Sequence, residues 1–374
     1  MKFSVIQLVA TVILIAASPS VLAAFGSSAK EAASIESYAA TLEALKPLAT
    51  KGDAEAQFQL GAMYEKGQGA PRSYKEAVMW YQKSANLGYA KSQNSLGDMF
   101  YHGNGVPQDY RKAMEWYHKA AELNNADAAY SLGEIYYSGK GVPQDYRKAM
   151  EWYRKAAEQG NTDAAYNLGE IYYNGNGVLQ DYEESLAWFR KAGEMKDVES
   201  QYRLGWMYFK GKGVAQDYKE SMAWFRKAAD RGHPAAQVCV GWLFQNGLGV
   251  TQDYQQALTW YRRAAARHAE AQNNLGAMYE NGLGVPQDST IAVSWYRKAA
   301  ERDHAEAQFR LGAMYEQGKG VQQDLLTAYM WFGLAAEAGN IDAIKRMEIA
   351  ETRMAAHQLE KSREMQKEWL ENHR

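Results

Sequence analysis

Residues 90–123 read AKSQNSLGDMFYHGNGVPQDYRKAMEWYHKAAEL, and close variants of this stretch fill most of the chain. Its two halves each place apolar residues at helical spacing, which predicts two amphipathic helices that face each other. Gly103 and Gly105 stand between the halves, and Pro107 and Asp109 precede the second one. Glycine commonly ends a helix, whereas proline and a short carboxylate commonly begin one. The stretch therefore predicts a helical hairpin.

Eight copies of this hairpin follow one another along the chain. Each copy has one glycine inside its first helix, at Gly61, Gly97, Gly133, Gly169, Gly205, Gly241, Gly276 and Gly312. Each also has one tryptophan in its second helix, at Trp80, Trp116, Trp152, Trp188, Trp224, Trp260, Trp295 and Trp331. The spacing is 36 residues, with one step of 35. Units this short bury too little apolar surface to fold alone, so the copies must stack.

The repeated polar and small residues have structural roles. An aspartate precedes each second helix from the second copy onward, where its carboxylate can accept from the first free amides of the helix. These aspartates are Asp109, Asp145, Asp181, Asp217, Asp253, Asp288 and Asp324. A glycine inside a helix costs about 1 kcal/mol relative to alanine, so eight of them need a compensating gain. We expect that gain to be close helix packing that makes room for the Trp and Tyr rings.

The single short step lies before the seventh copy. The turn there reads Arg267-His268-Ala269, whereas the preceding one reads Arg231-Gly232-His233. One residue, which we take to be the glycine, is missing from the later turn. We expect a local change of curvature between the sixth and seventh copies.

The first residues differ from the repeat array. Residues 1–23 combine Lys2, an apolar run from Phe3 to Ala17 and a small residue at Ala23, which predicts a secretory signal peptide. The run is too short for a membrane span and no second one follows, so we expect no transmembrane anchor. An uncleaved anchor is the alternative. We therefore expect an exported protein, either periplasmic or secreted.

The rest of the chain divides into caps and repeats. We expect an N-terminal capping helix in 24–52, eight repeats over 53–339, and C-terminal capping helices in 340–374. The array is expected to stop there because Glu348 occupies the place of the close-packing glycine. The approximate repeat bounds are 53–88, 89–124, 125–160, 161–196, 197–232, 233–267, 268–303 and 304–339.

Composition narrows the classes of partner. The formal net charge is −2, and no basic cluster suggests a nucleic acid. The only cysteine is Cys239, so the chain cannot form a disulfide within itself.

The pattern L-G-x-M-Y-x-x-G-x-G-V-P-Q-D-Y-x-x-A-x-x-W-Y-x-K-A-A resembles the Sel1-like repeat family, a relative of the tetratricopeptide repeats, over about residues 53–339. Tetratricopeptide repeats have a period of 34 residues, and their tryptophan lies in the first helix. The resemblance implies an all-α, right-handed α/α superhelical solenoid whose first helices line a concave face. It also implies a non-enzymatic scaffold or adaptor for protein partners, and bacterial members of the family are often exported.

Catalytic and metal-binding patterns are weak. The G-x-G motifs lack the Lys-Ser/Thr of a phosphate loop. His233, His268 and His304 occupy related turns, which stacking would separate by about 10 Å, too far to share a metal. We expect them to be solvated. Cys239 has no visible catalytic partners. We therefore expect no catalytic residue, no metal and no cofactor.

Two positions of the first helix depart from the repeat and suggest a binding surface. One residue after the glycine, Trp206 and Trp242 replace Ala, Asp or Glu. Four residues after it, Tyr101, Tyr137, Tyr173 and Phe209 occupy the middle copies. We hypothesise that these six aromatics form a partner-binding stripe, since exposed aromatics are favoured at protein interfaces. Its polar rim would comprise Glu134, Asn167, Glu170, Asn174, Arg203 and Lys210. The alternative is that the rings fold back against neighbouring repeats.

These observations favour an exported bacterial interaction scaffold that binds an envelope or host protein, including a host-contact role in virulence or cell entry. One alternative is a periplasmic regulator that binds an envelope sensor protein. Another is an enzyme or binder that acts on cell-wall or β-lactam compounds. The paired cysteines of the β-lactam-associated members of the family are absent here, so that activity does not carry over.

Overall fold

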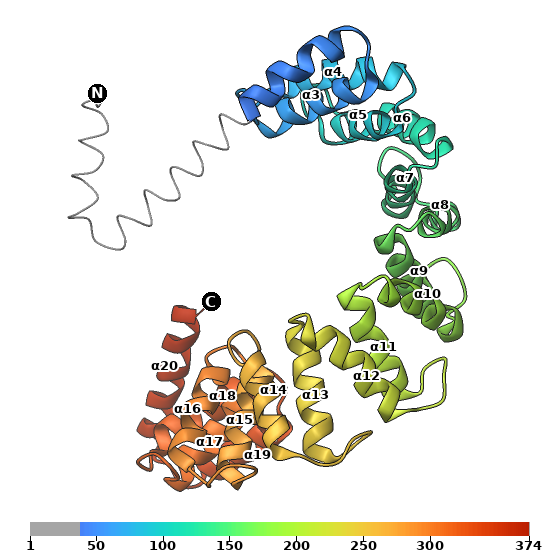
Figure 1. Ribbon diagram of the computed structural model, residues 1–374. Helices are drawn as coiled ribbons and strands as arrows, with labels where there is room; N and C mark the ends of the chain where they lie inside the picture. The colour runs from blue at the N-terminus through green and yellow to red at the C-terminus, as the bar shows by residue number, and fades with distance from the viewer. Residues whose placement is uncertain (1–37, 374) are drawn as a thin grey trace, which may run out of the picture. The chain divides into compact units, whose positions relative to one another are not determined.

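The computed structural model describes residues 38–373, which form helices joined by turns, with no strand among them (Figure 1). The predicted signal peptide, residues 1–23, and the first part of the predicted N-terminal cap, residues 24–37, lie outside the described residues. The first described helix spans residues 38–50.

Eight helical hairpins follow, each with a first and a second helix. The first helices are α3 (Ala54–Lys66), α5 (Ala90–His102), α7 (Ala126–Ser138), α9 (Thr162–Asn174), α11 (Val198–Lys210), α13 (Pro234–Asn246), α15 (Ala269–Asn281) and α17 (Ala305–Gln317). The second helices are α4 (Tyr74–Asn86), α6 (Tyr110–Glu122), α8 (Tyr146–Glu158), α10 (Tyr182–Glu194), α12 (Tyr218–Asp230), α14 (Tyr254–Ala264), α16 (Ser289–Ala300) and α18 (Leu325–Glu337). Two further helices, α19 (Ile341–Glu351) and α20 (Ala356–His373), end the chain.

The chain forms two compact units, and the division between them falls in the sequence between Gln180 and Asp181. The first unit ends at Gln180 and contains the described helices up to α9. The second unit begins at Asp181 and contains α10 to α20. The first four first-helices therefore belong to one unit, and the last four to the other.

The predicted helix boundaries have the expected chemistry. Asp109 accepts hydrogen bonds at 3.1 Å from the backbone amides of Arg111 and Lys112 at the start of α6. Gly103 ends α5 in the left-handed conformation, with φ of 75°, and donates to the Met99 carbonyl. The other predicted capping aspartates, Asp145, Asp181, Asp217, Asp253, Asp288 and Asp324, also cap their helices.

In seven of the repeats, the glycine inside the first helix makes room for a ring of the second helix. A Cβ atom on Gly97 would lie 2.5 Å from the Tyr117 ring, and one on Gly205 would lie 2.4 Å from the Phe225 ring. Both rings are completely buried. The close packing predicted from the sequence is therefore present, and the ring that needs the space is the residue that follows the repeat tryptophan.

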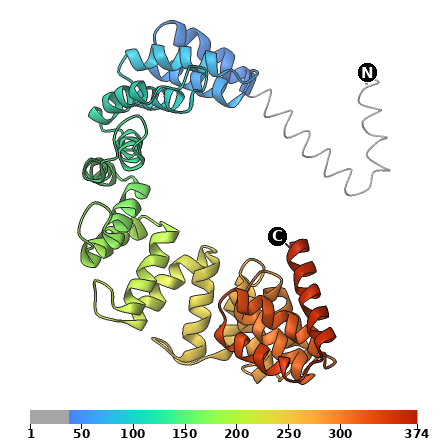
Figure 2. The same cartoon turned by 180° about the vertical axis from the view of Figure 1, so that it is seen from behind.

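Five of the repeat tryptophans are only half-buried, whereas Trp224, Trp260 and Trp331 are buried. Trp116 is half-buried, and the Lys119 ammonium lies 4.0 Å from its ring centroid. Because i and i+3 residues are neighbours on a helix, the lysine covers the exposed ring face. In the eighth repeat Leu334 stands at the lysine position, and Trp331 instead packs against Trp369 of α20, with a centroid distance of 5.8 Å. Figure 2 shows α20, in red, against the orange helices of that repeat.

The shortened turn before α15 lacks the residue that has positive φ in other turns. Gly232 has φ of 89° before α13, and Asp303 has φ of 58° before α17. Helix α14 ends at Ala264, and no residue with positive φ precedes His268. The residue missing from this turn is therefore the one with positive φ, at the position of the glycine that the sequence predicts to be missing. No described helix is long and apolar enough to cross a membrane.

Candidate functional site

Partly buried hydrogen bonds, which we call the polar network, join the first and second helices in the second and third repeats. Asp98, one residue after the mid-helix glycine of α5, accepts a hydrogen bond from the Tyr117 hydroxyl at 2.7 Å. Glu134 of α7 accepts from the Tyr153 hydroxyl at 2.5 Å and from the Asn167 amide at 2.9 Å. Burial raises the pKa of Asp98 to about 6, although the bond from Tyr117 opposes that shift. In these two repeats, the carboxylate one residue after the glycine therefore binds the second helix of its own hairpin.

In three other repeats, the hydroxyl of the equivalent tyrosine binds an acceptor one helical turn further along the first helix. The pairs are Tyr81 with Glu65 at 2.5 Å, Tyr261 with Gln245 at 2.8 Å, and Tyr296 with Glu280 at 2.5 Å. Each acceptor lies four residues after the mid-helix glycine. We call the places one and four residues after the glycine the acceptor positions, since in five repeats one of them binds the tyrosine hydroxyl.

The fifth repeat breaks this arrangement completely. Phe225 stands in place of the tyrosine, and Trp206 and Phe209 fill the two acceptor positions. A hydroxyl and its acceptor have thus been replaced together. Phe189 and Phe332 also replace the tyrosine, in the fourth and eighth repeats, but a glutamate remains at one acceptor position there. Only the fifth repeat combines the phenylalanine with two aromatic acceptor positions, so no polar group is left without its partner. An apolar surface results where neighbouring repeats are polar.

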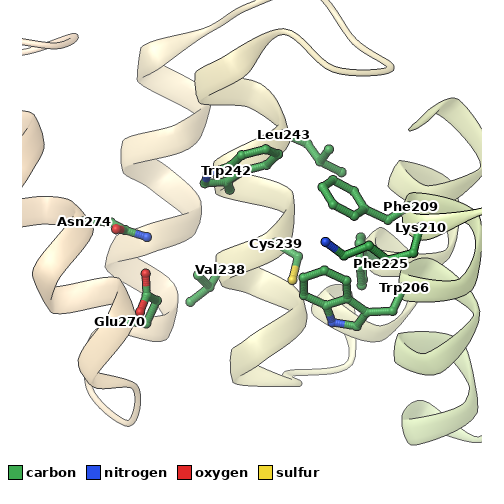
Figure 3. A pocket seen from close by; sticks show the side chains of 10 residues that line it. All are labelled: Trp206, Phe209, Lys210, Phe225, Val238, Cys239, Trp242, Leu243, Glu270 and Asn274. Atoms are coloured by element: carbon green, nitrogen blue, oxygen red, sulfur yellow. The ribbon is translucent and has the colours of Figure 1, made fainter. Parts of the chain in front are cut away.

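This surface forms a pocket of about 460 Å³ in the second unit, which we call the fifth-repeat pocket (Figure 3). Helix α11 contributes Trp206, Phe209 and Lys210, α12 contributes Phe225, α13 contributes Val238, Cys239, Trp242 and Leu243, and α15 contributes Glu270 and Asn274. Phe225 and Leu243 are buried, whereas Trp242 is 38% exposed. The pocket therefore has a fixed apolar base and an accessible tryptophan at its edge.

Three of the six predicted stripe residues meet in this pocket. The Trp206 and Phe209 rings lie edge to face with a centroid distance of 5.2 Å, and Phe209 contacts Trp242 in the same way at 5.6 Å. Phe209 also packs edge to face on Tyr218 of α12, at 5.4 Å. Such contacts fix ring orientation.

The remaining stripe residues belong to the first unit. The Tyr101 and Tyr137 rings each fold back on the first tyrosine of the second helix in their own repeat, with a centroid distance of 5.2 Å in both cases. Their hydroxyls bind side chains of the next repeat, at 2.8 Å from Lys140 and 3.3 Å from Asn176. Tyr173 is half-buried on α9. The Tyr101 and Tyr137 rings thus pack within their own repeats, and only their hydroxyls reach the next repeat.

The predicted polar rim is also divided. Glu134 and Asn167 belong to the polar network, and Asn174 donates to Glu170 at 3.5 Å. Arg203 pairs with Glu199 at 3.6 Å. Only Lys210 lines the fifth-repeat pocket.

Helix α15 forms the other wall of the fifth-repeat pocket, and its Glu270 is negatively charged, opposite to Lys210 of α11. Glu270 Oε2 lies 2.7 Å from His304 Nε2, and this hydrogen bond lowers the pKa of Glu270. Cys239 is half-buried between the charged walls, and burial raises the pKa of its thiol to about 12. The thiol is protonated at neutral pH, so it is poorly suited to nucleophilic chemistry.

His233 and His304 are not the solvated residues expected from the sequence. Each Nδ1 accepts the backbone amide three residues later, from Ala236 at 3.0 Å and Ala307 at 3.2 Å, and so caps its helix. Their side chains are 18% exposed and contact a carboxylate of the preceding first helix. That carboxylate lies 34 residues earlier in the sequence, so helical pattern alone does not reveal the contact. Within residues 38–373, no group of three potential ligands could hold a metal.

The chain belongs to the Sel1 repeat family. The family matches eight consecutive stretches, residues 54–89, 90–125, 126–161, 162–197, 198–233, 234–268, 269–304 and 305–340. Proteins built from these repeats are generally scaffolds for protein–protein interaction and are typically not enzymes. No curated protein matches the chain.

Two solved structures resemble most of the chain. A Sel1 repeat protein from Oxalobacter formigenes is 32% identical, with a TM-score of 0.63, and the match covers 82% of this chain and 89% of that one. A protective antigen present in uropathogenic Escherichia coli strains, which displays the same repeat fold, is 30% identical. Its TM-score is 0.57, and the match covers 87% of this chain and 86% of that one.

Proposed function

We propose that this chain is an exported bacterial scaffold that binds a partner protein through the fifth-repeat pocket. The observation that carries the proposal is the replacement of the polar network by an apolar pocket with an exposed tryptophan, Trp242. Tryptophan is enriched among residues that dominate the binding energy of interfaces. A concave, largely apolar site with a few polar groups is also the usual form of a binding pocket.

Export is supported by the signal peptide that the sequence predicts in residues 1–23. An exported scaffold would meet proteins of the bacterial envelope or of a host. Similarity to a protective antigen of uropathogenic Escherichia coli supports host contact, since an antigen is met by the immune system of the host. We therefore propose a host-contact role, and an envelope partner is the alternative outcome of the following test.

The test is photo-cross-linking in living bacteria, alone and in contact with host cells. Trp242 is replaced by p-benzoylphenylalanine, and Leu179, which is 91% exposed and outside the pocket, is replaced in the same way as a matched control. We expect a protein adduct from position 242 that is absent from position 179. The same adduct yield at both positions, or none at 242, would overturn the proposed function. Fractionation of the cells then identifies the adduct as an envelope or host protein and locates the scaffold.

A further inference from the structure

The apolar part of the fifth-repeat pocket is already organised to receive a side chain. Phe225 and Leu243 form its base, and the base is buried. The edge-to-face contacts of Phe209 with Trp206 and Trp242 hold the two indoles on either side. Figure 3 shows one indole on α11 and the other on α13. Because these rings are already oriented, binding a partner side chain would cost little ordering entropy.

The α11 wall presents a cation without an acidic partner. The Lys210 ammonium lies 5.7 Å from the Trp206 ring centroid and 5.2 Å from that of Phe209. Within residues 38–373, no carboxylate forms an ion pair with it, whereas Arg203 on the same helix pairs with Glu199. In Figure 3 the ammonium points from α11 into the pocket. Lys210 can therefore bind an acidic group of a ligand without breaking an existing ion pair.

The α15 wall has the opposite preference. His304 binds the Glu270 carboxylate at 2.7 Å, and this contact favours the charged form of the acid. Asn274 lies on the same helix beside it. A negative group of a ligand would be repelled at this wall and attracted at the α11 wall. The pocket therefore favours a ligand whose negative group lies at the α11 wall and not at the α15 wall.

We propose that the fifth-repeat pocket binds a segment of the partner protein in which a large apolar residue lies next to an acidic residue. The apolar side chain occupies the space between Trp206 and Trp242, and the acid pairs with Lys210. This inference rests on the proposed function and adds the chemistry of the segment that is bound.

Two other ligand classes fit the pocket less well. A cationic ligand would bind the aromatic faces and Glu270. The ammonium of Lys210 already lies over the Trp206 and Phe209 rings, however, and would repel such a ligand. A neutral sugar could stack on one indole but would leave the Lys210 ammonium without a counter-charge. An acidic, apolar peptide segment is compatible with both walls.

The test selects displayed random twelve-residue peptides on the purified protein and on a Lys210→Glu variant. We expect peptides from the unchanged protein to contain a large apolar residue with Asp or Glu within two positions. The variant should select Lys or Arg at that place, because reversing the charge reverses the preference. Absence of the acid from the first selection, or the same charge preference in both, would overturn the inference.

Synthetic peptides then give a quantitative check. For a selected peptide, changing its acid to the matching amide should weaken binding about three-fold for the unchanged protein and have almost no effect for a Lys210→Met variant, as a partly exposed ion pair predicts. Equal losses for both proteins would contradict the pairing. Muropeptides are titrated in parallel, and their binding in place of the peptides would also overturn the inference.

The two proposals fail in different ways. If Trp242 yields an adduct but the selected peptides carry no acid, the partner site stands and its inferred chemistry is wrong. If position 242 yields no adduct beyond the Leu179 control, the proposed function itself is wrong. Melting curves for Lys210→Glu and Lys210→Met accompany each assay, and we expect little change because Lys210 is exposed.

Discussion

The third and fifth repeats share one backbone plan but fill the same positions with opposite chemistry. In the third, Glu134 accepts a partly buried hydrogen bond from the hydroxyl of Tyr153, which joins the two helices of the hairpin. In the fifth, Trp206 and Phe225 occupy the equivalent places and help to form an apolar pocket. One backbone plan can therefore carry either a polar or an apolar surface, and in the fifth repeat both partners of the hydrogen bond are replaced together.

The largest expected effect tests what the two repeats have in common. Gly133→Ala and Gly205→Ala should each lower the free energy of unfolding by about 2–3 kcal/mol, because the new Cβ would lie about 2.5 Å from a buried ring. The gain in helix propensity, about 1 kcal/mol, offsets only part of that cost. Urea denaturation followed by circular dichroism measures it. Stabilisation by either substitution would show that the ring can move aside.

The next prediction concerns how the free energy of unfolding depends on pH. This dependence should arise from Asp98 of the polar network. Since the pKa of Asp98 is raised from its ordinary value of 3.8 to about 6, protonation of Asp98 favours the folded state. Its contribution is fully present below the unfolded pKa and is lost as the pH rises through 6. Between pH 4 and pH 7 it should decrease by about 2 kcal/mol. We expect Asp98→Asn to remove this part of the pH dependence of unfolding, and an unchanged profile would contradict the assignment.

Two substitutions that make the fifth repeat resemble the third should have a smaller effect on stability. Phe225→Tyr should lower the free energy of unfolding by about 1–2 kcal/mol, because the new hydroxyl would be buried without an acceptor. Trp206→Glu in the same chain should restore about 1 kcal/mol by supplying one. A double-mutant cycle measures this coupling. Strictly additive effects of the two substitutions would mean that the repeats are not interchangeable in this way.

The smallest expected loss of stability comes from the lysine that covers the repeat tryptophan, and it should be similar in the two repeats. Lys155→Met and Lys227→Met each remove an ammonium that lies over the repeat tryptophan, at 5.1 Å and 3.6 Å from the ring centroid. Each loss should be about 0.5 kcal/mol, since the contacts are partly exposed. Thermal melting of both variants checks it, and a shift larger than that of Gly205→Ala would be unexpected.

Most of the fold could be predicted from the sequence because its determinants are local and repeated. The period, the capping aspartates and the turn glycines define each hairpin without knowledge of its neighbours. The missing left-handed residue before His268 could also be located, since seven other turns supply the comparison. The capping roles of His233 and His304 were missed because a histidine cap depends on side-chain geometry that the helical pattern does not encode.

Only half of the predicted stripe lies in the candidate site, also for physical reasons. Tyr101 and Tyr137 have the same spacing as Phe209, but their hydroxyls bind Lys140 and Asn176 of the next repeat. The contribution of Phe225 was missed, although the sequence holds a clue. In the fifth repeat, phenylalanine replaces the buried tyrosine while both acceptor positions become aromatic. That combined change, rather than aromatic spacing alone, marks the pocket.

We propose that the fifth-repeat pocket binds a partner because the tyrosine hydroxyl and its acceptor are both absent there. The dissociation constant of a pocket-selected peptide, measured by calorimetry, tests it in the variant that carries both Trp206→Glu and Phe225→Tyr. We predict binding at least about ten times weaker, which corresponds to about 1.4 kcal/mol, for a variant that melts within a few degrees of the unchanged protein. Unchanged affinity in that folded variant would show that binding does not depend on the apolar chemistry of the fifth repeat.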